Sequence, residues 1–210
     1  MGDRVRFVCF DLGGVIIRIC QTWEERVTAA GLEMRYPVLW DNIGPTRDAL
    51  MVRYMTGRIT GRQFAQYLSA TMDGQYNPAE VMAIHDAWLI DEYEGVGSIV
   101  DQLHQAGLDT AALSNTTPEH WGRMDEFPTV GRLRHRFASH ELGIQKPDPA
   151  IYRHVQQQLG YRGKQILFLD DAHENVIAAR DVGWRATRVD PAGVPAQQIV
   201  DALAEHGVLV

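Results

Sequence analysis

The segment that most constrains the fold of this chain is VRFVCFDLGGV at residues 5–15, where an apolar run stops at an aspartate followed by two glycines. The run is apolar on both faces, which is typical of a strand that helices cover on both sides of a parallel sheet. Ligands of such sheets bind beyond the carboxyl ends of the strands. Asp11 stands at such an end, and Gly13 and Gly14 let the backbone approach a ligand or an ion closely.

Further apolar runs end in polar residues, and helical patterns lie between them. Strands are predicted at residues 5–10, 110–113, 137–139, 166–169 and 185–189, and helices at residues 95–107, 148–159 and 174–182. Each helical pattern is amphipathic and ends near a glycine, as helices with a C-capping glycine do. Strands that alternate with helices of this length predict an α/β fold with a doubly wound parallel sheet.

The alternation disappears between residues 17 and 93. The region from Trp23 to Leu89 has helical spacing, and glycines and prolines break it into short pieces. We expect a small helical domain inserted after the first strand, so that residues 1–16 and 94–210 form a core and residues 17–93 a helical cap. The side chains expected to form the cap's own core are Met51, Tyr54, Met55, Phe64, Tyr67 and Leu68.

Composition limits the partners of the chain. The formal net charge is -7 and the lysines and arginines are scattered, which argues against a nucleic-acid surface. No apolar stretch approaches about 20 residues, so neither a membrane span nor a signal peptide is expected. Cys9 and Cys20 lie eleven residues apart and fit two free thiols in a reducing compartment. We expect a soluble cytoplasmic protein that binds a small molecule, and the sequence does not give its oligomeric state.

Four short segments lie at or just after the ends of predicted strands: DLGG at residues 11–14, SNT at 114–116, QKP at 145–147 and DD at 170–171. The carboxyl ends of parallel strands meet at one edge of a sheet, so these segments are expected to come together. They supply a nucleophilic carboxylate, a hydroxyl near backbone amides, a lysine and a pair of acids. Phosphoryl transfer needs an attacking anion and positive charge around the phosphate. The acids suit Mg²⁺, which takes oxygen ligands.

These segments, in this order, make the chain similar to the haloacid dehalogenase (HAD) superfamily, in the subgroup with a helical cap after the first motif. The four motifs read FDLGGV, LSN at residues 113–115, GIQKPDPAIY at residues 143–152 and FLDDAHENVIAAR at residues 168–180. The resemblance covers nearly the whole chain. It implies a Rossmann-like core, a Mg²⁺-dependent hydrolase and an aspartyl-phosphate intermediate at Asp11.

The resemblance also implies a role for each site residue. Asp11 would be the nucleophile and a Mg²⁺ ligand, with the Gly13 carbonyl and Asp171 as further ligands and Asp170 supporting the metal. The phosphate-binding groups would be Ser114, the Asn115 amide and Lys146, which would neutralise the phosphate and Asp11 together.

The same residues also have simpler, purely structural interpretations. In these, Lys146 would be a solvated loop cation. Asp170 and Asp171 would be N-cap residues of the helix that begins near Glu174, where an aspartate also favours the helix dipole.

The chain departs from the superfamily at Gly13. Most phosphatases of this superfamily have an aspartate there, which protonates the leaving oxygen and then activates water. Such general acid–base catalysis contributes on the order of 10²–10⁴-fold, or about 3–5 kcal/mol of barrier. An ordinary alkyl phosphate is therefore expected to be a poor substrate.

Three explanations of Gly13 stay open. The substrate has a good leaving group, as in acyl, aryl or sugar 1-phosphates; or His173, Thr116, Arg18 or Trp23 replaces the acid; or the protein binds a phosphate ester without hydrolysing it. Dehalogenase chemistry is disfavoured, because paired aspartates suggest a metal that it does not use. Trp23, Arg18, Trp40 and Arg47 are further candidates for substrate contacts. The main hypothesis is a Mg²⁺-dependent phosphatase of small phosphorylated metabolites.

Overall fold

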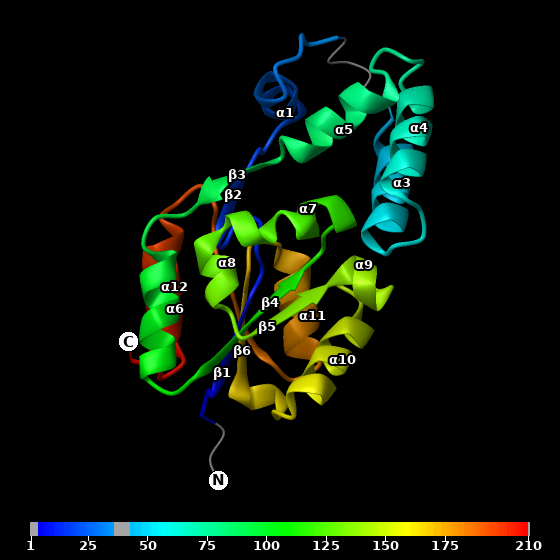
Figure 1. Ribbon diagram of the computed structural model, residues 1–210. Coiled ribbons are helices and arrows are strands. Elements are labelled where there is room, and N and C mark those ends of the chain that lie inside the picture. The colour runs from blue at the N-terminus through cyan, green and yellow to red at the C-terminus, as the bar shows by residue number, and fades with distance from the viewer. Residues whose placement is uncertain (1–3, 36–42, 210) are drawn as a thin grey trace.

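A sheet of five parallel strands forms the centre of the computed structural model, which describes residues 4–35 and 43–209 (Figure 1). In spatial order the strands are β5 (His135–Ala138), β4 (Asp109–Ser114), β1 (Phe7–Phe10), β6 (Ile166–Asp170) and β7 (Arg185–Arg188). β1 pairs with β4 on one side and with β6 on the other, so the sheet is built outward from β1 in both directions. The predicted α/β fold with a doubly wound sheet is confirmed.

Helices cover both faces of the sheet because the side chains of β1 alternate between two apolar layers. Val8 and Phe10 belong to the layer formed with α6 (Val96–Gln105) and α12 (Pro195–Glu205). Phe7 and Cys9 belong to the layer formed with α10 (Pro149–Leu159) and α11 (His173–Asp181). In Figure 1, α6 and α12 lie to the left of the sheet and α10 and α11 to the right.

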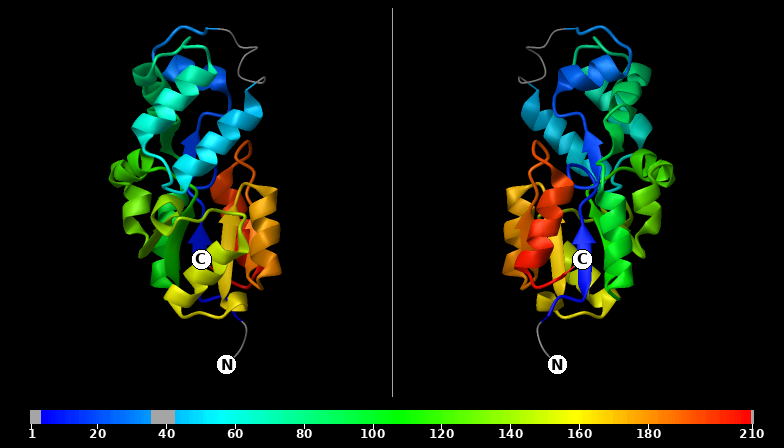
Figure 2. Two further views of the ribbon diagram at one scale, coloured as in Figure 1. Left: turned by 90° about the vertical axis from the view of Figure 1, so that its right-hand side faces the viewer. Right: turned by 90° about the vertical axis from the view of Figure 1, so that its left-hand side faces the viewer.

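Four helices stand above the carboxyl ends of the strands and form the cap (Figures 1 and 2): α1 (Trp23–Ala29), α3 (Gly44–Met55), α4 (Gly61–Thr71) and α5 (Pro78–Asp86). Capping boxes begin three of them, at Thr22, Thr60 and Asn77. The helices share an apolar core around Tyr54 and Phe64, whose rings stack with centroids 4.7 Å apart. The division at residues 1–16, 17–93 and 94–210 stays a prediction.

The chain enters and leaves the cap through a two-stranded antiparallel ribbon that the sequence analysis missed. Its strands are β2 (Ile17–Ile19) and β3 (Leu89–Glu92). Ile17 is the register partner of Glu92, and Arg18 that of Asp91. Both strands are short, and Arg18, Asp91 and Glu92 interrupt the apolar run that would have marked them.

Short helices also occur where the sequence predicts none. α7 (Pro118–Gly122), η1 (Met124–Glu126) and α8 (Pro128–Arg132) lie between β4 and β5, α9 (Ser139–Leu142) follows β5, and η2 (Gly163–Gln165) precedes β6. Helices of one or two turns leave little periodicity to detect. Over residues 4–35 and 43–209, no helix has the length and apolar character needed to span a bilayer.

The expected cap core is correct in part. Tyr54, Phe64 and Leu68 are buried in it, and Met51 packs against it. Tyr67 is 45% exposed, and Met55 lines a cavity between the cap and the sheet, so for these two the prediction is wrong. Helical spacing places residues on one face of a helix, but it does not say which of them reach a cavity.

Two buried histidines join the cap to the core. The ring of His85 in α5 stacks on the ring of His120 in α7 with centroids 4.0 Å apart. His120 Nε2 donates to the His85 carbonyl at 2.8 Å, and His85 Nε2 lies 3.0 Å from the Thr117 hydroxyl. Burial lowers the pKa of His120 to about 4 and lowers the pKa of His85 well below its ordinary value. Both rings are therefore neutral near pH 7.

This pair predicts a loss of stability in acid. Between pH 6.5 and about 4 the unfolded chain binds protons at these histidines that the folded protein does not, so the free energy of unfolding decreases as the pH falls. His120 alone accounts for about 2 kcal/mol at pH 5. Denaturant titrations at several pH values between 5 and 7 measure the free energy of unfolding. In a His120→Gln variant this free energy should decrease less steeply with falling pH than in the natural protein. His135→Gln, at an exposed histidine, is the control. The same pH dependence of the free energy of unfolding in both variants would contradict the role given to His120.

Candidate active site

The four polar segments come together around a cavity of about 500 Å³ between the sheet and the cap. Their residues that line it are Asp11, Leu12, Gly13, Ser114, Asn115, Thr116, Gln145, Lys146, Pro147 and Asp171. Asp170 ends β6 and is fully buried beside them. The volume is in the range of small-molecule sites, and the position is the edge of the sheet where open α/β folds bind ligands.

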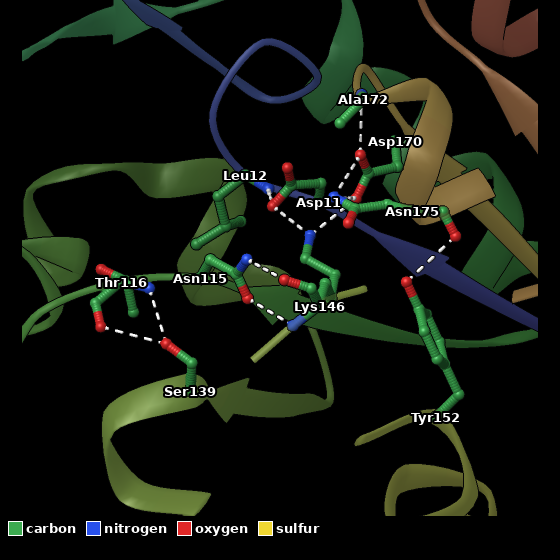
Figure 3. A network of polar contacts seen from close by, with 10 residues as sticks. All are labelled: Asp11, Leu12, Asn115, Thr116, Ser139, Lys146, Tyr152, Asp170, Ala172 and Asn175. Carbon is green, nitrogen blue, oxygen red and sulfur yellow. Dashed lines mark hydrogen bonds and ion pairs between the residues drawn. The ribbon is translucent and has the colours of Figure 1, made fainter. Parts of the chain in front are cut away.

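Lys146 lies between two carboxylates at the floor of this cavity (Figure 3). Its Nζ is 2.9 Å from Asp11 Oδ1 and 2.6 Å from Asp170 Oδ2, and 1% of its side chain is exposed. Burial alone would lower the pKa of the Lys146 ammonium, but the two carboxylates raise it above its ordinary value. The lysine is therefore charged, and its interpretation as a solvated loop cation is wrong.

Asn175 in α11 holds Asp170 and is a residue that the sequence analysis missed. Its side-chain Nδ2 donates to Asp170 Oδ1 at 2.9 Å and to Oδ2 at 3.1 Å, while its backbone carbonyl accepts from the Tyr152 hydroxyl. With Lys146 and the Ala172 N–H as further donors, both oxygens of Asp170 are occupied. The available signal was a polar residue on the buried face of a predicted helix.

The N-cap interpretation of the aspartate pair is wrong. α11 begins at His173 with Ala172 as its N-cap, and no side chain caps it. Asp170 belongs to the end of β6 instead. Asp171 follows it and lines the cavity.

Asp11, Asp170 and Asp171 form a cluster in which one oxygen of each lies within 4.8 Å of the others. Burial raises the pKa of Asp11, with Lys146 opposing the shift and Asp170 adding to it. Burial, and then the charge of Asp170, raises the pKa of Asp171. The ammonium balances one of the three carboxylates, which leaves two negative charges. An all-oxygen donor set with that charge fits Mg²⁺.

Asn115 fixes the loop that carries Lys146. Its Nδ2 donates to the Lys146 carbonyl and its Oδ1 accepts from the Lys146 N–H, both at 2.8 Å (Figure 3). Both polar atoms of the Asn115 side chain are thus engaged by the loop. Ser114 ends β4, is 5% exposed and lines the cavity.

The two glycines after Asp11 differ in the space around them. Gly14 has a φ of +78°, and a Cβ there would lie 2.5 Å from Asp171 Oδ2, so only glycine fits. A Cβ at Gly13 would have Ile19 Cδ1 as its nearest neighbour at 3.4 Å, an ordinary contact. The backbone therefore accepts a side chain at Gly13.

Of the residues considered for the absent acid or for substrate contact, Thr116 alone in the described part of the chain lines the main cavity. His173 is exposed on the first turn of α11. The others that the structure describes line neighbouring cavities: Trp23 and Arg47 line one, and Arg18 lines another. Trp40 lies outside the described residues.

The fold and the polar floor of the cavity agree with a comparison to known families. The family model described as haloacid dehalogenase-like hydrolase matches residues 5–183, so this chain belongs to that family of hydrolases. The resemblance inferred from the four motifs is thereby confirmed.

Individual relatives are more distant. Phosphoglycolate phosphatase of Pseudomonas putida is 26% identical over 195 residues, which are 87% of this chain and 68% of that protein. Acyl-CoA dehydrogenase family member 10 of Mus musculus is 24% identical over 90% of this chain, and the matched part is 18% of its length. Among solved structures, a HAD family enzyme of Bacteroides thetaiotaomicron has a TM-score of 0.77 at 20% identity, covering 93% of this chain and 98% of its own.

Proposed function

We propose that this protein is a Mg²⁺-dependent phosphatase that hydrolyses small phosphorylated metabolites through a phosphorylated Asp11. The observation that carries the proposal is the buried Lys146 between Asp11 and Asp170 at the floor of the cavity. Two likenesses support it. The Pseudomonas putida relative is a phosphoglycolate phosphatase, and the Bacteroides thetaiotaomicron enzyme has been solved in complex with magnesium and inorganic phosphate.

Asp11 would act as the nucleophile. The Leu12 N–H and Lys146 hold its Oδ1, which leaves Oδ2 to attack phosphorus. The bond from phosphorus to the leaving oxygen breaks, and its electron pair stays on that oxygen. Water then attacks the phosphorus of the aspartyl phosphate, which releases inorganic phosphate and restores the carboxylate.

The other residues of the site would hold the phosphate and the metal. Lys146, the Ser114 hydroxyl and the Asn115 amide would bind phosphate oxygens. The groups that would hold Mg²⁺ are the carboxylates of Asp11 and Asp171 and the Gly13 carbonyl, supported by Asp170. When bound, Mg²⁺ would offset the charge of the phosphate and of Asp11, so that two anions can approach each other.

Gly13 leaves the departing oxygen without a general acid at that position. A leaving group that is stable as an anion needs no proton from the enzyme. We therefore expect acyl, aryl and anomeric sugar phosphates to be hydrolysed faster than alkyl phosphates such as sugar 6-phosphates.

A panel of substrates graded by leaving-group acidity tests the proposal. It consists of acetyl phosphate, nitrophenyl phosphate, a sugar 1-phosphate and a sugar 6-phosphate, each assayed for phosphate release with Mg²⁺ and after chelation by EDTA. The expected result is Mg²⁺-dependent release that decreases along this series. Halide release from 2-haloacids that survives EDTA would instead identify a dehalogenase. Tight binding of phosphate esters without release from any of them would identify a binding protein, which Gly13 makes the second candidate.

Restoring the absent acid should broaden the substrate range. Because a Cβ fits at Gly13, a Gly13→Asp variant should hydrolyse sugar 6-phosphates about 10²-fold faster, while acetyl phosphate gains less. The kcat/KM values of both substrates, measured for the variant and for the natural protein, check this expectation. A Gly13→Asn variant has the same size without the acid and should show no such gain. Equal gains for both substrates would contradict the role of the leaving group.

A further inference from the structure

Beyond the polar floor, apolar side chains make up most of the cavity lining, and we call them the apolar wall. They are Ile17, Ile19, Met55, Trp88, Leu89 and Met124. Ile17, Ile19 and Leu89 come from the β2–β3 ribbon, and Met55 is the last residue of α3. The cap and its ribbon therefore supply most of the surface that a leaving group would contact.

Positive charge is confined to the floor. In residues 4–35 and 43–209, Lys146 is the one lysine or arginine that lines this cavity, and it already contacts Asp11 and Asp170. Asp171 and Glu174 line the same cavity. A substrate with a second anionic group would bring it to an apolar wall or next to these carboxylates, where no cation would balance its charge.

Two arginines of the cap, Arg26 and Arg47, line a separate cavity of about 290 Å³. The Arg26 guanidinium stacks on the Trp88 ring, 3.8 Å from its centroid, and Trp88 separates the two cavities as a residue of both linings. Trp88 therefore contributes to the main cavity, while Arg26, which stacks on it, lines the neighbouring cavity.

We infer that the substrates of this enzyme are aryl phosphate monoesters, in which a neutral aromatic ring occupies the apolar half of the cavity. This inference rests on the proposed phosphatase function and names its substrate class. Two independent features agree on it. The apolar wall favours a ring over a polyhydroxylated sugar, and the absence of an acid at Gly13 favours a phenolic leaving group, whose pKa is about 10, over an alcohol.

The chemistry balances without a further reactant. The oxygen–phosphorus bond of the ester breaks as the bond from Asp11 to phosphorus forms, and the phenolate leaves with the electron pair. A water oxygen then bonds to phosphorus as the bond from Asp11 to phosphorus breaks, which releases inorganic phosphate. The phenolate takes a proton from solvent. The products are one phenol and one inorganic phosphate.

The first test compares 1-naphthyl phosphate with glucose 1-phosphate, 2-phosphoglycolate and acetyl phosphate. Acetyl phosphate has a good leaving group but no ring, so its hydrolysis reports phosphatase activity without contact to the whole apolar wall. The expected result is a kcat/KM for 1-naphthyl phosphate at least about tenfold above those for glucose 1-phosphate and 2-phosphoglycolate. Hydrolysis of acetyl phosphate together with equal or better use of either of these two would overturn the inference and leave the phosphatase function standing.

A pair of methionine variants tests the wall itself. Met55 and Met51 are half-buried residues one turn apart on α3, but Met55 lines the main cavity and Met51 the neighbouring one. Met55→Gln should lower the ratio of kcat/KM for 1-naphthyl phosphate over acetyl phosphate about tenfold, because a polar amide replaces a thioether of similar length. Met51→Gln should leave that ratio unchanged. The same change of ratio in both variants would contradict the inference.

Calorimetric titration decides the case in which no ester is hydrolysed. The protein, with Mg²⁺ present, is titrated with 1-naphthyl phosphate and with 2-phosphoglycolate. Binding of the aryl ester at least about tenfold tighter, weakened by Met55→Gln and not by Met51→Gln, would keep the ligand class and reject only the hydrolysis. Equal binding of both ligands would overturn the inference.

Discussion

An Asp11→Asn variant should lose phosphate release by about 10³-fold or more while remaining folded. The amide has the shape of the carboxylate but cannot form an aspartyl phosphate. Burial raises the pKa of Asp11, and two further carboxylates lie within 4.8 Å, so the change removes one of three crowded negative charges. We therefore expect the free energy of unfolding to be unchanged or slightly higher. Phosphate release from acetyl phosphate with Mg²⁺ and a denaturant titration measure the two effects.

The matched control for this variant is Asp181→Asn, at an exposed aspartate that ends α11. It carries the same chemical change away from the cavity and should retain full activity. Mg²⁺-dependent phosphate release that survives in Asp11→Asn would falsify the proposed mechanism. Loss of activity together with loss of structure would be at odds with the crowding of negative charge in the cluster.

A Lys146→Met variant should lose both activity and stability. The ammonium lies between Asp11 and Asp170 with 1% of its side chain exposed, so its removal leaves buried carboxylates without their cation. Removing one partner of a buried ion pair costs about 3–5 kcal/mol of folding free energy. Losing a charge that stabilises the reacting phosphate lowers the rate by on the order of 10²–10³-fold. Denaturant titrations and phosphate release with Mg²⁺ measure these losses.

The pH dependence of this variant tests the cause. Without Lys146, the pKa of Asp11 should rise further above its value in the unfolded chain. Between pH 7 and 5 the folded variant then holds more protons than the folded natural protein, so its stability relative to the natural protein increases as the pH falls. The difference in unfolding free energy between the two should therefore shrink over that range. The control is Lys164→Met, at the exposed one of the two lysines of the chain, which should lose neither activity nor stability. If the difference in unfolding free energy between Lys146→Met and the natural protein stayed constant with pH, lost packing would be the cause instead.

The five-stranded sheet and the polar floor of the cavity were predictable because short local sequence patterns indicate both. β1 is a buried apolar run, and Asp11 follows it directly, so one segment indicates both the strand and the position of its carboxylate. Lys146 was found from its motif, but its burial between two aspartates depends on strands far apart in the chain. The role of Asn175 was missed because its partner Asp170 lies five residues earlier, across the turn that joins β6 to α11.

The cap could be predicted only as a class of structure. Met51 and Met55 have the same chemistry and lie on adjacent turns of α3, yet they line different cavities. Their difference arises from how α3 packs against α4 and α9, which no local pattern encodes. The apolar wall is for this reason the part of the cavity that needed the structure.

The β2–β3 ribbon brings the two ends of the cap segment together, since Ile19 and Leu89 are register partners. Each doubling of the length of a flexible loop adds only about 0.6 kcal/mol to the cost of closing it, so the ribbon tolerates long inserts of different lengths. The strands of the five-stranded sheet pair with one another and not with the ribbon, so their register does not depend on the length of the chain between Ile19 and Leu89. Changes in the helical segment between Ile19 and Leu89 would therefore alter the part of the apolar wall that Met55 and Trp88 supply, and would leave the polar floor in place on the sheet.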